Sequence, residues 1–77
     1  LGAQISDVRL KKNVTPIGKA RNGLNLYAWE WNEAANAVGQ HGSGAGVIAQ
    51  EAQVLRPEAV TRGSDGYLRV DYNKVLV

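Results

Sequence analysis

The sequence predicts a small α+β domain in which short helices pack on antiparallel strands. Three observations point to this fold class. Residues 25–32, NLYAWEWN, alternate aromatic and other side chains with the period of two that is typical of a strand. Further along, Ile48, Ala52 and Leu55 recur at helical spacing. An Asp-Gly pair at 65–66, between two apolar segments, then indicates a hairpin turn.

The length limits the chain to one domain. With 77 residues, the core buries barely enough apolar surface to offset the entropy lost on folding. The chain has no cysteine, which excludes a disulfide framework and a thiolate zinc site. Since 44% of the residues are hydrophobic, the composition is that of a globular protein. Self-association is the remaining ordinary way to stabilise so small a core.

A first helix is predicted at residues 15–23. Thr15 can cap it, Pro16 suits the first helical position, and Asn22–Gly23 would end it. Its inner face would carry Ile17, Ala20 and Leu24.

The strand at residues 25–32 follows, with Tyr27, Trp29 and Trp31 on one face. In a chain without phenylalanine, this aromatic stripe favours a core or a subunit interface over a surface that stacks a sugar or a base.

The second half of the chain begins with a glycine-rich segment at residues 39–46, GQHGSGAG, which indicates a flexible loop. The helix at 46–55 comes next, with room for a short strand before it, and Pro57 closes it. A hairpin is predicted from Ala59–Thr61 and Tyr67–Tyr72, with Leu68, Val70 and Tyr72 on one face. Residues 73–77 end on apolar side chains, as at the start of a further helix.

Charge and composition argue against several classes of function. The net charge is +2 and the basic residues are dispersed without interleaved aromatic residues, which favours a solvated face over a nucleic-acid site. The single histidine, His41, lies among glycines without carboxylate neighbours, so we expect no metal. Gly42, Gly44 and Gly46 match no phosphate-binding pattern, so we expect no cofactor. We expect neither a signal peptide nor a membrane-spanning segment.

A serine and a lysine near the start of the chain, Ser6 and Lys11, form the most notable candidate site. A serine hydroxyl becomes a nucleophile when a base takes its proton, and a lysine is such a base if burial or a neighbouring cation lowers its pKa. Arg9 and Lys12 are such neighbours. From spacing alone, Ser6–Asp7 fits a helix cap or a turn equally well.

Four segments together carry a resemblance to a known family. They are SDVRLKKNVTPI at 6–17, YAWEW at 27–31, GVIAQEAQVLRPEAV at 46–60 and GYLRVDYNKVLV at 66–77. In order and spacing they resemble the intramolecular chaperone domain, or peptidase S74 family, at the C-terminus of phage tailspikes, tail fibres and endosialidases. The resemblance covers residues 6–77 and leaves 1–5 as the end of an upstream shaft or a linker.

The resemblance implies an assembly function. Family members form homotrimers that align three chains of a fibrous shaft, and they then release themselves by autoproteolysis. The implied partners are two identical chains and the chain's own shaft, during virion assembly in the host cytoplasm. Family members usually continue past the Val-Asp-Tyr segment into a long helix, so the C-terminal helix here is expected to be short or truncated at Val77.

The resemblance also implies roles for individual residues. Ser6 matches the family's nucleophile and Lys11 its general base, while Asp7 and Arg9 complete the motif Ser-Asp-x-Arg-x-Lys. The scissile bond should adjoin Ser6. Its hydroxyl can reach the preceding carbonyl through a five-membered ring, which favours the bond from Ile5 to Ser6, and the bond from Ser6 to Asp7 remains open.

Two alternatives to a self-cleaving chaperone stay open at the level of sequence. The domain could be a trimerisation cap that does not cut itself and is retained on the mature fibre. It could instead bind a glycan or a nucleic acid on the aromatic face around Trp29 and Trp31. The same domain type also occurs in membrane-tethered transcription factors, and the sequence favours a phage protein only weakly over this host.

Overall fold

The computed structural model describes residues 3–77 and confirms an α+β domain with antiparallel sheets. One sheet contains β1 (Gln4–Ile5), β6 (Leu68–Val70) and β5 (Val60–Arg62), in that order. The other contains β2 (Lys11–Lys19), β3 (Asn25–Trp31) and β4 (Ser43–Gly46). The helices are α1 (Glu33–Ala37), α2 (Ala49–Leu55) and α3 (Tyr72–Val75), and the 3-10 turns are η1 (Val8–Leu10) and η2 (Pro57–Ala59). The homotrimer stays a prediction.

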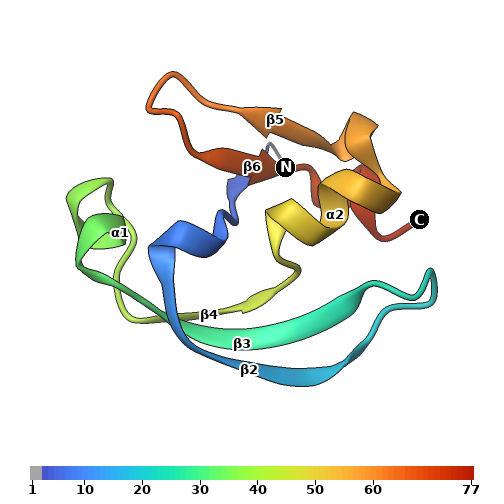
Figure 1. The fold of residues 1–77 in the computed structure, drawn as a ribbon, viewed down its shortest axis with the longest axis horizontal. Helices are drawn as coiled ribbons and strands as arrows, with labels where there is room; N and C mark the ends of the chain where they lie inside the picture. Colours follow the sequence, from blue (N-terminus) through green and yellow to red (C-terminus); the bar gives the residue numbers. More distant parts are fainter. Residues whose placement is uncertain (1–2) are drawn as a thin grey trace.

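The core lies between the two sheets, where α2 and η1 are placed (Figure 1). On α2, Ala49 and Ala52 are completely buried, and small side chains at these positions let the helix approach β5 and β6 closely. The largest buried cluster contains Leu24, Val47, Ala49, Ala52, Ala59, Leu68, Val70 and Val75.

The aromatic strand is confirmed as β3, the central strand of its sheet. Trp29 is only 5% exposed, and its ring meets that of Trp31 edge to face with the centroids 5.4 Å apart. The prediction that this stripe serves the core is therefore confirmed for Trp29, while Tyr27 and Trp31 are half-buried.

The predicted helix at 15–23 is wrong, because these residues continue β2 and then turn back into β3. Pro16 pairs with Tyr27 on an edge strand, where a missing N–H need not break a ladder. Gly23, with φ of +91°, forms the turn instead of ending a helix. Ile17, expected to face inward, is 59% exposed, whereas Leu24 is buried as predicted.

The glycine-rich segment is only partly a loop, because Ser43–Gly46 forms β4 and pairs with β3. This position favours glycine for packing reasons. Gly46 has φ of +149°, and a Cβ there would collide with the hydroxyl of Tyr72. That hydroxyl accepts a hydrogen bond from Val47 N at 3.1 Å, so the close approach ties the end of β4 to α3.

The remaining elements are largely as predicted. The helix α2, a short strand before it, the hairpin of β5 and β6 and a final helix are all present. Tyr72 belongs to that helix rather than to the strand, because Asp71 caps α3 by accepting a hydrogen bond from Asn73 N. The sequence analysis missed α1, a five-residue helix that Asn32 caps through Ala35 N.

The packing predicts that two leucines differ strongly in how much they contribute to the free energy of unfolding. Leu68→Ala should lower the free energy of unfolding by about 3 kcal/mol, because Leu68 is 4% exposed within the core. The matched change Leu55→Ala should cost less than about 1 kcal/mol, because Leu55 is 41% exposed. Urea unfolding measures both, and equal losses would contradict this description of the core.

Candidate active site

Ser6 and Lys11 are brought together by a single tight turn. The chain leaves β1 at Ser6, passes through η1 and enters β2 at Lys11. Asp7 caps η1 by accepting a hydrogen bond from Arg9 N at 3.0 Å, so this turn is set by the residue that follows the serine. As a result, Lys11 Nζ lies 2.9 Å from Ser6 Oγ and donates a hydrogen bond to it.

A backbone carbonyl completes the pair. Val47 O, between β4 and α2, accepts hydrogen bonds from Ser6 Oγ and, at 2.9 Å, from Lys11 Nζ. The backbone of Ser6 is held as well. Its N–H donates to Leu68 O at 3.2 Å, and its carbonyl accepts from Ala49 N at 2.9 Å. Segments that are far apart in the sequence therefore fix both the main chain and the side chain of the serine.

Burial makes the lysine amine a weak base. Ser6 is 1% exposed and Lys11 is 7% exposed. Loss of hydration disfavours the charged amine and lowers the pKa of Lys11 from 10.5 to about 7, although the charges of Asp7 and Glu51 act in the opposite direction. About half of the amine is therefore neutral near pH 7, which is the form that can take a proton.

Asp7 is buried and remains ionised. Burial alone would raise the pKa of its carboxyl, but hydrogen bonds from the Arg9 guanidinium, Leu68 N, Arg9 N and the Gln50 amide lower that pKa well below its usual range. The Arg9 guanidinium contacts both carboxylate oxygens, at 3.0 and 2.8 Å. Leu68 N donates to the carboxylate at 2.9 Å, and Gln50 Nε2 donates at 2.8 Å. The sequence motif thus holds the turn that aims Ser6 at Lys11.

The sequence analysis did not assign a role to Gln50 or to the Val47 carbonyl. Gln50 links α2 to η1, because its Oε1 accepts from Val8 N at 2.9 Å while its amide nitrogen binds Asp7. The GVIAQE segment, on which part of the resemblance rests, could have indicated Gln50. No residue type signals a backbone carbonyl, so Val47 O could be found only from the structure.

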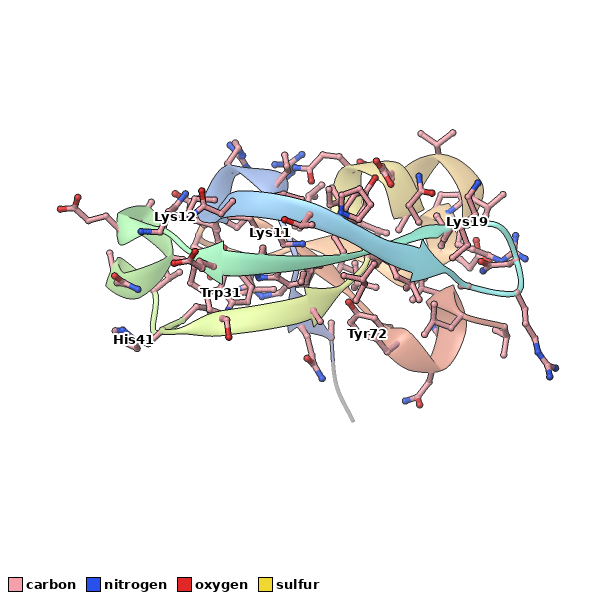
Figure 2. The ribbon with its side chains drawn as sticks, turned by 90° about the horizontal axis from the view of Figure 1, so that it is seen from below. Lys11, Lys12, Lys19, Trp31, His41 and Tyr72 are labelled. Atoms are coloured by element: carbon pink, nitrogen blue, oxygen red, sulfur yellow. The ribbon has the colours of Figure 1, made fainter. Side chains whose placement is uncertain are left out.

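Of the other candidates, His41 lies apart from this site. Figure 2 shows His41 at one end of the molecule, away from Lys11. Residues 3–77 contain no cluster of histidine, aspartate and glutamate that could hold a metal ion. No helix in this part of the chain is long and apolar enough to cross a membrane. Trp29 is too deeply buried to offer an open stacking face.

The structure is thus a small α+β domain with a buried serine–lysine pair behind its first strand, which is an arrangement suited to nucleophilic chemistry. Comparison with protein-family models identifies the family. The family described as the chaperone of endosialidase, or peptidase S74, matches residues 6–61, which is more than half of the chain. The chain belongs to this family, and this supports a chaperone role on a phage tail protein. No curated protein and no solved structure matches the chain significantly.

The buried lysine predicts an unusual pH dependence of stability. Between about pH 7 and pH 10.5, the unfolded chain binds a proton at Lys11 that the folded chain does not. The free energy of unfolding should therefore rise with pH across this window, by on the order of a few kcal/mol.

Denaturant unfolding at several pH values measures this slope. Lys11→Met should flatten it and stabilise the protein at pH 7, because Ser6 Oγ still has Val47 O as its partner. Lys12→Met is the matched control at an exposed position and should keep the wild-type slope. A wild-type curve that is flat from pH 7 to 10.5 would contradict the buried, neutral amine.

The buried carboxylate of Asp7 predicts how stability depends on pH in the acid range. Asp7→Asn should cost about 3 kcal/mol at pH 7, because an amide cannot accept all of the hydrogen bonds that the two carboxylate oxygens accept. The lowered pKa of Asp7 gives wild type a stabilisation that is present above about pH 4 and lost as the pH falls further. Acid titrations should show a shallower loss in Asp7→Asn. Asp71→Asn should be nearly neutral at pH 7, because asparagine also caps helices.

Proposed function

We propose that this chain is an intramolecular chaperone that aligns three copies of a phage tail fibre or tailspike shaft and then cuts itself off beside Ser6. The observation that carries the cutting step is the contact of Lys11 Nζ with Ser6 Oγ at 2.9 Å, at a lysine whose pKa is lowered to about 7. Membership of the chaperone-of-endosialidase family carries the assembly step.

The assembly step has a physical reason. Long repetitive strands specify their register weakly, and bringing three chains together is slow. A compact domain that associates first can hold three shafts in register. Its removal afterwards would leave the shaft without its folding aid, so that the shaft persists through a high barrier to unfolding.

The chemistry of the cut follows from the positions of the side chains. In the structure the Ser6 hydroxyl donates to Val47 O, so the O–H first rotates toward the lone pair of neutral Lys11. Lys11 then takes this proton as Oγ attacks the carbonyl carbon of Ile5. The bond from that carbon to Ser6 N breaks, and Lys11 returns the proton to the departing amine. The resulting ester joins the Ile5 acyl group to Ser6 Oγ. Water then hydrolyses it, which gives a carboxylate at Ile5 and restores the serine hydroxyl.

Two features favour the bond before Ser6 over the bond after it. Attack on the Ile5 carbonyl closes a five-membered ring, whereas attack of Oγ on the carbonyl of its own residue would close a strained four-membered ring. A cleft of about 580 Å³ also reaches Ile5, between β1 and the edge of β4, and it would admit the hydrolytic water.

A shaft or reporter protein fused before Leu1 tests the proposal. Wild type should separate by first-order kinetics, and Ser6→Ala and Lys11→Met should each slow the cut at least about 100-fold. The rate should rise about tenfold per pH unit below pH 7 and level off above it, because the pKa of Lys11 is about 7. Ser64→Ala and Lys12→Met, at exposed positions, are the matched controls.

Intact and native mass spectrometry read the outcome. An upstream product that ends in Ile5 identifies the favoured bond, and one that ends in Ser6 identifies the other. A wild-type chain that stays uncut but trimeric would mean that the domain is a trimerisation cap retained on the fibre. A monomer that stays uncut would refute the proposal as a whole.

A further inference from the structure

Trp29 contacts the lysine of the candidate site with the face of its ring. Lys11 Nζ lies 3.6 Å from the centroid of the Trp29 ring, on its face. The same nitrogen donates to Ser6 Oγ and to Val47 O. The amine therefore has two oxygen acceptors and an aromatic face as neighbours.

An aromatic face can stabilise the charged form of a lysine base without competing for its proton. The negative face of an indole attracts an ammonium group without accepting its proton, and the attraction is strongest where water is excluded. When Lys11 takes a proton from Ser6, positive charge appears on Nζ beside the ring. Contact with Trp29 thus stabilises the charge that develops in the reaction, and it restricts a side chain that would otherwise have many rotamers.

The position of the indole depends on a glycine on the neighbouring strand, because the ring packs closely against the backbone there. Gly44 pairs with Trp29 in the β3–β4 ladder, and a Cβ on Gly44 would lie 2.9 Å from Trp29 Nε1 and 3.0 Å from Cε2. The φ of Gly44 is outside the left-handed region, so close approach rather than backbone conformation requires glycine there. A methyl group at this position would press on the edge of the indole ring and displace the ring.

The indole N–H shows that the ring is not placed for its own hydrogen bond. Trp29 is 5% exposed, and among the described residues its Nε1 has no hydrogen-bond partner. A buried unpaired donor is destabilising and calls for an explanation. Contact of the ring face with Lys11, at the cost of this N–H, supplies one.

We propose that Trp29, whose ring packs against the backbone of Gly44, is the positioning residue that holds Lys11 against Ser6. This inference rests on the proposed function, because it gives the ring a part in the cutting reaction. Trp29 touches no reacting atom of the peptide bond and acts only through Lys11.

The rate of cutting tests the inference with two pairs of variants in the reporter fusion. At pH 8.5, Trp29→Leu should slow the cut on the order of tenfold, whereas Trp29→Phe should stay within about threefold of wild type, because phenylalanine keeps a ring face and removes the unpaired N–H. Gly44→Ala should slow the cut several-fold by displacing the indole. Ala34→Ser adds one atom at an exposed position of α1 and should have no effect.

The pKa of Lys11 tests the same contact without any cutting. In a Ser6→Ala background, lysines labelled with ¹³C at Cε give four signals, and the one lost in Lys11→Met belongs to Lys11. Replacing Trp29 by Leu should lower this pKa further, by on the order of half a unit to one unit, because the ammonium loses its aromatic face. Phenylalanine should restore it, and the acid limb of the rate profile should move with it.

The outcomes separate this inference from the proposed function. If Leu and Phe at position 29 behave alike in both measurements, or if the pKa of Lys11 is unmoved, the inference is wrong. A rise in the pKa with Leu would mean that Trp29 only excludes water, which also overturns a positioning role. If wild type is uncut while the pKa shifts as expected, the hold of Trp29 on Lys11 stands and the cutting reaction is refuted.

Discussion

The buried carboxylate of Asp7 is the interaction on which the rest of the structure depends. It accepts hydrogen bonds from the backbone of Leu68 in β6, from the Gln50 amide in α2 and from Arg9 in η1. The bond to Leu68 explains how the chain leaves the first sheet. Ser6 N still pairs with Leu68 O, but the carbonyl of Ser6 turns away to Ala49 N, and the Asp7 side chain takes the place of that carbonyl. One side chain therefore ends β1, begins η1 and sets the direction of Ser6.

Asp7 and Lys11 are opposite solutions to the problem of burying a charge. Asp7 keeps its charge because donors on every side replace water, so its ionised form stabilises the fold. Lys11 has two acceptors and an aromatic ring but, within residues 3–77, no direct carboxylate partner, so it tends to lose its charge. A neutral lysine is useful as a base and costly for stability in a domain of 77 residues with a small margin. The hydrogen bonds to Asp7 stabilise the fold and help to offset that cost.

The sequence predicted the elements whose signals are local and failed where pairing decided the outcome. Alternation from Tyr27 to Trp31 was enough for β3, because period two is a property of the strand itself. Thr15 and Pro16 carry the local signal of a helix start, yet the aromatic strand needs a neighbour, and β2 supplies it. Ser43–Gly46 has weak strand propensity and becomes a strand because β3 lies beside it and Trp29 needs a glycine at position 44.

The candidate site divides in the same way. The residues of the Ser-Asp-x-Arg-x-Lys motif could be named from the sequence because the resemblance gives them roles, although spacing alone did not distinguish a site from a helix cap. Asp7 turned out to do both, since it caps η1 and orders the turn at the site. Contact of Trp29 with Lys11 could not be predicted, because it depends on the register that places Lys11 opposite Trp31, which is two residues from Trp29 along β3. That register is a property of the folded hairpin.

The position of Ser6 also limits what a cut would disturb. Every member of the main core cluster follows Ser6 in the chain, whereas Ala3 and Gln4 are exposed and Ile5 is half-buried. Upstream of Ser6, the pairing that holds the described chain is the two-residue strand β1 against β6. Breaking the bond before Ser6 would free this short strand and leave the Asp7 network and the core intact. Breaking the bond after Ser6 would instead separate Asp7 from the carbonyl that Ala49 holds, so the chain loses least when the cut precedes the serine.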